Sequence, residues 1–119
     1  MFFNRTVIDE NYSGLAFDEE AERCASVLND PRKKIMIMGN HGVMVMGDTV
    51  AETFDRLYYF ERAAETYIKA LQTGRTLRIL SDEVAEKVAF QNDNYHGFAE
   101  RHFENLVTIL DNEGSDFAS

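Results

Sequence analysis

The sequence predicts a mixed α and β fold, in which a small and mainly antiparallel sheet is covered by helices. Two short apolar runs of strand length, residues 35–38 and 43–46, lie on either side of a glycine-bounded turn. A long segment that follows residue 49 repeats apolar side chains at helical spacing. A chain of 119 residues can bury one core. We therefore expect a single domain over residues 1–119.

The segment before the apolar runs predicts a weak strand, a turn and a helix. Residues 1–12 have weak strand character, and residues 11–14 have the composition of a turn. Asp18 is a favourable N-cap for a helix that runs to about Leu28, because acidic residues in its first turn suit the positive end of the helix dipole. The sequence at residues 29–31 includes a proline and ends this helix.

The two apolar runs predict strands joined as a hairpin. Neither run alternates with polar residues, so we expect each strand to be covered on both faces. The turn between them is Gly39-Asn40-His41-Gly42. Asn and Gly accept the positive φ angles that such turns require, which favours a hairpin at this point.

The long helix is the best-defined element in the sequence. Thr49 and Glu52 form a capping box at its start, and Gly74 follows its end. Its surface carries two favourable i,i+4 ion pairs, Glu52–Arg56 and Glu65–Lys69. Aromatic residues lie on more than one side of it, which suggests a subunit contact: Tyr58, Tyr59, Phe60 and Tyr67.

The C-terminal part predicts further helix. Ser81 caps a second helical segment, and the poor helix formers at residues 92–97 leave either a kink or a break there. The tail from Asn112 onward is polar.

Within the long helix, Glu61 falls in the apolar stripe. Two interpretations of Glu61 are possible, a buried ion pair with an arginine or an intrahelical role.

Charge and cysteine content exclude several classes of function. The net charge of -9 and the pI near 4.7 argue against binding to nucleic acid or to an anionic membrane surface. The single cysteine, Cys24, cannot form an intramolecular disulfide, which fits a reducing, cytoplasmic location. With no local base to activate it, Cys24 is expected to be a buried structural thiol. We expect no signal peptide and no membrane span.

The three histidines differ in their prospects as ligands. His41, in the turn between two strands, is either a zinc ligand or a histidine hydrogen-bonded in a tight turn. His96 and His102 are six residues apart, which does not place them on one face of a helix. We therefore expect His96 and His102 to be surface residues.

Several stretches resemble the class II aldolase/adducin head-domain family. The most specific are residues 38–43, residues 47–52 and residues 54–64, with sequences MGNHGV, GDTVAE and FDRLYYFERAA. Weaker similarity covers residues 3–5, 12–14 and 18–20, and then residues 102–106, 110–111 and 116–117. The resemblance implies a layered αβα fold of the class II aldolase type, of which this chain matches the C-terminal half.

The resemblance also implies a function. Family members hold a metal, here expected to be Zn²⁺, with two histidines of a His-x-His motif and the histidine of Asn-His-Gly, and only the last has a counterpart, His41. The acid/base glutamate also has no counterpart, so no catalytic residue is assigned. The parent protein would be a zinc-dependent lyase or epimerase acting on a small sugar or hydroxy-carbonyl substrate. This chain would then be a truncated reading frame or fragment, or its missing part would come from elsewhere, and we expect no catalysis by it alone.

The adducin branch of the same family implies an alternative, a non-catalytic interaction or oligomerisation module. Half of the family's sheet would leave a strand edge and an apolar face exposed, and exposed edges pair with other strands. We therefore expect a homo-oligomer.

Overall fold

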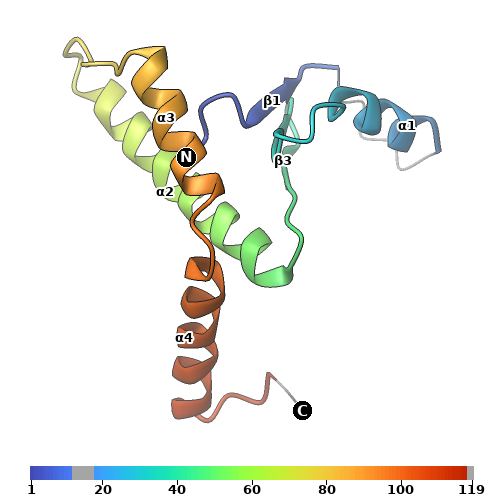
Figure 1. The fold of residues 1–119 in the computed structure, drawn as a ribbon, viewed down its shortest axis with the longest axis vertical. Helices are drawn as coiled ribbons and strands as arrows, with labels where there is room; N and C mark the ends of the chain where they lie inside the picture. Colours follow the sequence, from blue (N-terminus) through green and yellow to red (C-terminus); the bar gives the residue numbers. More distant parts are fainter. Residues whose placement is uncertain (12–17, 118–119) are drawn as a thin grey trace. The chain divides into compact units, whose positions relative to one another are not determined.

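The computed structural model describes residues 1–11 and 18–117, which form three strands and four helices (Figure 1). In chain order these are β1 (Thr6–Asp9), α1 (Asp18–Val27), β2 (Ile35–Met38), β3 (Gly42–Val45), α2 (Val50–Gln72), α3 (Asp82–Asp93) and α4 (Phe98–Asn112). The elements fall into two compact units. Unit 1 comprises the described part of residues 1–46 together with residues 78–93, and unit 2 comprises residues 47–77 and the described residues from 94 onward.

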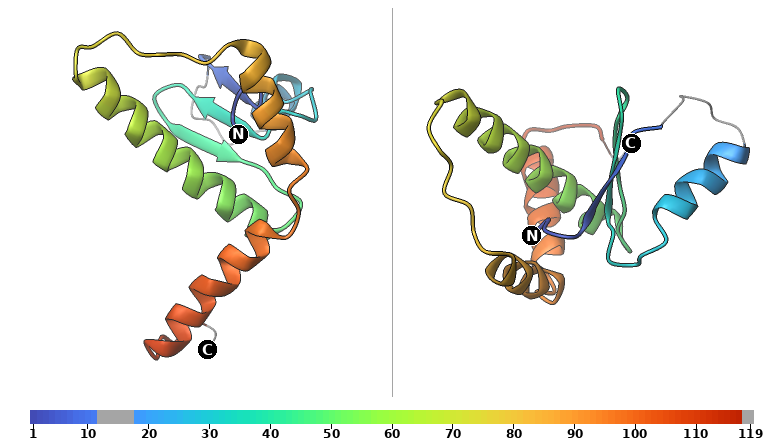
Figure 2. Two further views of the ribbon diagram at one scale, coloured as in Figure 1. Left: turned by 60° about the vertical axis from the view of Figure 1, so that its left-hand side comes forward. Right: turned by 90° about the horizontal axis from the view of Figure 1, so that it is seen from above.

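Unit 1 is built on a sheet of three strands in the order β1-β2-β3. The β2–β3 pair is the antiparallel hairpin that the sequence predicts, and β3 begins one residue earlier than expected. The β1–β2 pair is parallel, because α1 connects the two strands and allows the chain to return in the same direction, so the sheet is mixed. Figure 2 shows α1 and α3 on opposite sides of this sheet.

The buried apolar core of unit 1 is small. Among the described residues, the fully buried apolar side chains are Ile35 and Met36 of β2 and Ala89 of α3. The expectation that each strand of the hairpin is covered on both faces of the sheet therefore holds for the first half of β2. It is wrong for β3, because Gly42 and Met44 share a face that the described residues leave exposed, with Met44 36% exposed.

An arginine attaches α3 to the segment before β1. Arg5 is only 4% exposed, and its guanidinium donates to Glu86 at 2.6 Å and to Asp93 at 2.7 and 2.9 Å. It also donates to the carbonyl of Phe3 at 3.2 Å. Arg5 holds the pKa of Glu86 below its usual value. The helix is thus held by charge-assisted hydrogen bonds as well as by the burial of Ala89.

Unit 2 begins with the predicted capping box. The Thr49 hydroxyl accepts from the amide of Glu52 at 3.1 Å, and the Glu52 carboxylate accepts from the amide of Asp48 at 3.1 Å. Gly47 is required beside this cap, because a Cβ there would lie 2.6 Å from Thr53 Oγ1. Gly74, at φ 66°, follows the end of α2 as predicted.

The segment at residues 92–97 is a break between two helices, since α3 ends at Asp93 and α4 begins after Gly97, which has φ 77°.

Both i,i+4 ion pairs that the sequence predicts on α2 are present. The predicted turn at residues 11–14 lies largely outside the described residues. In the described part of the chain, no helix has both the length and the apolar character needed to cross a bilayer.

Candidate functional site

The Asn-His-Gly turn lies between β2 and β3 and is fixed by backbone contacts. The His41 amide donates to the Met38 carbonyl at 3.1 Å, and Asn40 has the positive φ, 58°, that the turn requires. The Gly39 amide donates to the Asp9 carbonyl at 2.8 Å. A Cβ at Gly39 would lie 3.3 Å from that carbonyl, so glycine suits this close approach. The turn is therefore held against the end of β1.

His41 itself is exposed at the tip of this turn. Zinc sites in proteins use three or four protein ligands. Within the described residues, the three potential ligands whose donor atoms lie within 4.8 Å of one another are Asp9, Glu20 and Cys24, and His41 is not one of them. The described residues therefore do not complete a zinc site around His41.

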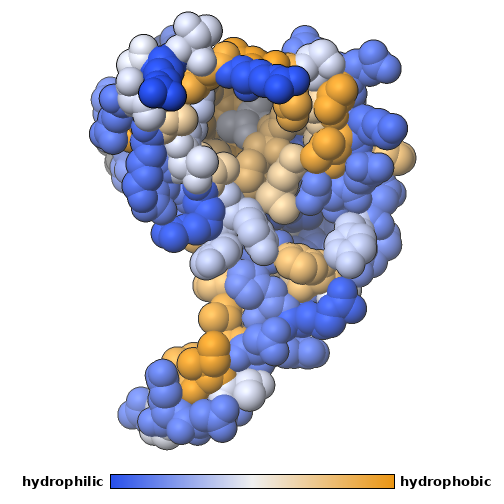
Figure 3. Space-filling model, turned by 90° about the vertical axis from the view of Figure 1, so that its left-hand side faces the viewer, coloured by the Kyte–Doolittle hydropathy of each residue, from blue (hydrophilic) through white to orange (hydrophobic). Residues whose placement is uncertain are grey.

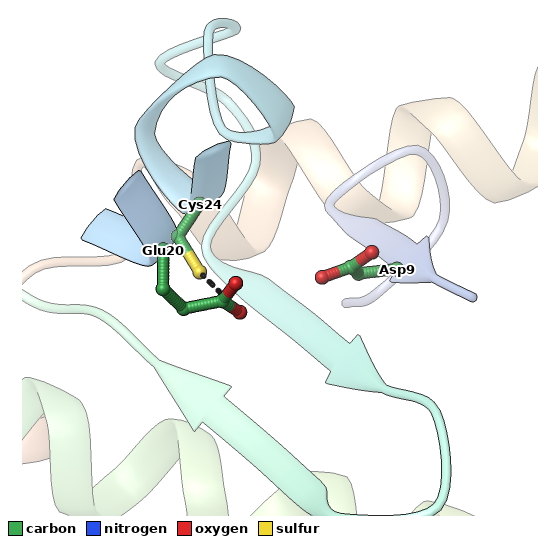
Figure 4. Close-up of side chains that lie close together, drawn as sticks. All are labelled: Asp9, Glu20 and Cys24. Carbon is green, nitrogen blue, oxygen red and sulfur yellow. Dashed lines mark hydrogen bonds between the residues drawn. The ribbon is translucent and has the colours of Figure 1, made fainter. Parts of the chain in front are cut away.

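The side chains of Asp9, Glu20 and Cys24 come from β1 and from one face of α1 (Figure 4). Arg23 bridges the two carboxylates. It donates to Asp9 Oδ2 at 2.5 Å and from Nε to Glu20 at 2.9 Å, with a further bond from Nη2 to Glu20. Arg23 holds the pKa of Asp9 and the pKa of Glu20 below their usual values.

The thiol of this cluster is a poor ligand. Burial, followed by the charge of Glu20, raises the pKa of Cys24, and its Sγ lies 3.8 Å from Glu20 Oε1. A thiolate is the form that binds metal or attacks a substrate. The prediction of a structural thiol therefore agrees with the environment of Cys24, although its side chain is half-buried rather than fully buried. The cluster attaches α1 to the sheet.

Unit 2 contains a polar pair that the sequence analysis missed. Asp55 of α2 is 7% exposed, and its carboxylate lies 2.7 Å from Nδ1 of His102 on α4. The imidazole lies among three aromatic rings of α2, with centroid distances of 5.7 Å to Phe54, 4.9 Å to Tyr58 and 6.0 Å to Tyr59. The expectation that His102 is a surface residue was wrong, because α4 packs this face of its helix on α2.

A pattern in the sequence does mark this pair. Asp55 and Tyr59 are four residues apart, as are Phe98 and His102, so each polar residue shares a helix face with an aromatic one. By contrast Glu61 is exposed, which rules out the buried ion pair considered for it. His96 is exposed, as predicted.

Comparison with known proteins agrees with the architecture of the chain. Residues 1–68 match the family model described as Class II Aldolase and Adducin N-terminal domain. A putative aldolase class 2 protein of Caulobacter vibrioides is 35% identical over 77 residues, which are 64% of this chain and 29% of that protein. Human Beta-adducin is 29% identical over 116 residues, covering 82% of this chain and 16% of that protein.

A solved structure shares the fold. The crystal structure of an aldolase II superfamily protein from Pseudomonas syringae matches with a TM-score of 0.83 and 29% identity, over 99% of this chain and 47% of that one. The chain thus spans less than a third of the length of the two curated relatives and about half of this structural relative. The family model covers more than half of the chain and includes the Asn-His-Gly turn. The chain belongs to the class II aldolase and adducin family.

Proposed function

We propose that this chain is a non-catalytic interaction module of the class II aldolase and adducin family, and that it associates with itself. The observation that carries the proposal is the imbalance between its core and its surface. The fully buried apolar residues of the described chain are Ile35, Met36 and Ala89, whereas large apolar side chains are exposed in both units. The matches to adducins support the same reading.

The exposed apolar side chains are numerous and strongly exposed. In unit 1, Ile79 is 85% exposed and Phe90 is 62% exposed. In unit 2, Val50 is 74% exposed and Ile109 is 51% exposed. Figure 3 shows a group of apolar side chains at the surface along α4, at the lower end of the view. Many exposed large apolar side chains favour a binding partner that covers them, since burial of apolar surface is favourable by about 25 cal/mol per Å².

The geometry of the ligand-type residues supports a non-catalytic role. His41 has too few potential ligands close to it for a zinc site, and Arg23 already binds the carboxylates of Asp9 and Glu20. The raised pKa of Cys24 disfavours the thiolate that would bind a metal or attack a substrate. Its being the single cysteine of the sequence fits a reducing, cytoplasmic location.

Light scattering coupled to size-exclusion chromatography tests the self-association. We expect a dimer or a larger species at micromolar concentration, which dissociates on dilution by mass action. A stable monomer of 13.6 kDa at every concentration would overturn the proposal.

A second function is favoured by the position of His41 in the matched part of the family model. In this reading His41 supplies one zinc ligand to a site that another polypeptide completes, in a lyase or epimerase acting on a small sugar or hydroxy-carbonyl substrate. Elemental analysis of the purified chain distinguishes the two. One zinc per chain, lost in His41→Ala and kept in His96→Ala, would favour the metal site. Absence of zinc both from the wild-type chain and from its complex with any polypeptide that copurifies with it would favour the module.

A further inference from the structure

The two edge strands of the sheet in unit 1 differ in how they are protected. Natural sheets commonly protect an edge with charged residues, proline or a covering element. β1 follows Arg5 and ends at Asp9, and both side chains form salt bridges with helices. β3 has the sequence Gly42-Val43-Met44-Val45, with neither a charge nor a proline. Within the described residues, β3 is thus the unprotected edge.

The hydrogen-bond pattern of the hairpin shows which groups of β3 face outward. The Met46 amide donates to the Lys34 carbonyl at 2.9 Å, and Met44 pairs with Met36 two residues further along the ladder. In an antiparallel pair, hydrogen-bonded residues alternate with non-hydrogen-bonded ones. The amides of Met44 and Met46 therefore point to β2. The amides and carbonyls of Val43 and Val45 point to the free edge.

The charge distribution favours a second copy of the same chain as the occupant of this edge. Two copies that each carry a net charge of -9 repel one another over most of their surfaces. Residues 35–47 contain no Asp, Glu, Lys or Arg, and this is the longest uncharged stretch of the sequence. β3 lies within it. An edge-to-edge contact at β3 is therefore where two copies can approach without facing like charges on the paired strands.

We propose that β3 pairs antiparallel with β3 of a second copy, around a two-fold axis that passes beside Met44. Val43 of each copy then lies opposite Val45 of the other, and each of these two pairs exchanges two backbone hydrogen bonds. Met44 lies opposite Met44 of the second copy as a non-hydrogen-bonded pair. The result is a continuous sheet of six strands with an isologous interface. This inference rests on the proposed self-association and specifies its surface.

Cysteine cross-linking tests the register. Cα atoms of non-hydrogen-bonded antiparallel pairs are about 4.5 Å apart, which lies within the range of about 4.4–6.8 Å that a disulfide spans. In a Cys24→Ser background, we expect Met44→Cys to form a covalent dimer under mild oxidation on a non-reducing gel. Ile8→Cys in the same background is the matched control, because Ile8 is exposed on β1 and should cross-link at least tenfold less. Equal cross-linking of both variants, or of neither, would overturn the inference.

Proline substitution tests the outward hydrogen bonds. In Val45→Pro the lost amide faces the free edge, so the ladder to β2 is kept, and proline is tolerated at such edge positions. We expect a normal helical circular dichroism spectrum and a dimer dissociation constant raised about tenfold or more, because two interfacial hydrogen bonds are lost. Met44→Pro removes a ladder bond to β2 and should disturb the hairpin itself.

The outcomes separate this inference from the proposed function. A wild-type monomer would overturn both. A wild-type dimer that Val45→Pro leaves unchanged would overturn the β3 interface and leave self-association standing. If Val45→Pro does not fold, the Met44→Cys cross-link decides alone.

Discussion

The two units attach their helices in different ways. In unit 1, α1 and α3 are attached through arginine side chains, Arg23 to Asp9 and Arg5 to Glu86 and Asp93. In unit 2, α2 and α4 pack through aromatic rings around the pair of Asp55 with His102. The carboxylates that Arg5 binds are about two-fifths exposed, whereas Asp55 is nearly buried. Loss of the partner of Asp55 in unit 2 should therefore cost more than loss of the partner of Glu86 and Asp93 in unit 1.

The largest effect is expected from removal of the imidazole in unit 2. His102→Ala leaves the Asp55 carboxylate buried without its histidine partner, and removes a ring that contacts three aromatic side chains. Breaking a buried pair on one side costs about 3 kcal/mol. We expect urea unfolding followed by circular dichroism to show a loss of that size in the free energy of unfolding.

Two controls sharpen this prediction. His96→Ala changes an exposed histidine and should leave the urea midpoint unchanged. The double variant His102→Ala with Asp55→Ala should be more stable than the sum of the two single losses predicts, because the unpaired carboxylate is gone. Strict additivity would show that the two residues do not interact.

A smaller loss is expected in unit 1 when its buried arginine is replaced. Arg5→Met keeps much of the buried stem but removes the guanidinium that binds Glu86 and Asp93. Both carboxylates can be hydrated afterwards, so we expect a loss of about 2 kcal/mol, from charge-assisted hydrogen bonds alone. Hydrogen exchange of the α3 amides should be faster in this variant than in the wild-type chain. Arg78→Met is the matched control, because Arg78 is exposed and forms no salt bridge with a described residue. A comparable loss in both variants would contradict this account.

The same comparison explains what could be predicted from the sequence. The cap of α2 at Thr49 was predicted because its residues are neighbours in the chain, and the hairpin was predicted from two apolar runs that flank one turn. The contacts that attach the helices join distant residues, His102 to Asp55 across 47 positions and Arg5 to Asp93 across 88. Local patterns place Asp55 and His102 on helix faces that carry aromatic residues, but they do not indicate that these two faces meet. They also do not identify the partner of Arg5, because any of the many acidic residues could accept its hydrogen bonds.

The candidate site shows the same limit. The turn around His41 was predicted from Asn and Gly, whose backbone preferences are local. The cluster of Asp9, Glu20 and Cys24 was not predicted, because it forms only once α1 lies beside β1 and Arg23 reaches across. Asp9 is the last residue of its strand, which gives no indication of its partner.

The smallest expected effect is the response of unit 1 to acid. Arginine partners hold the pKa values of Asp9, Glu20 and Glu86 below their usual values, with Arg23 acting on the first two and Arg5 on the third. A carboxyl with a depressed pKa stabilises the fold above its usual pKa, and this stabilisation is lost as the pH falls through the depressed value. We therefore expect unit 1 to lose stability as the pH falls below about 4, the usual range of carboxyl pKa values.

The acid response can be assigned to the arginines by comparing variants. Arg23→Met removes the cause of the depressed pKa values at Asp9 and Glu20, so the free energy of unfolding should depend less steeply on pH below 4 than in the wild-type chain. Sodium chloride at 1 M should flatten the wild-type dependence only slightly, because the Asp9 and Glu20 carboxylates are largely shielded from solvent and such pairs are screened less than exposed ones. Amide exchange in α1 reports the effect locally, since this helix is joined to the sheet by Arg23. If the variant and the wild-type chain lost stability in parallel on acidification, the attachment of α1 would rest on apolar packing instead, and the contrast between the two units would disappear.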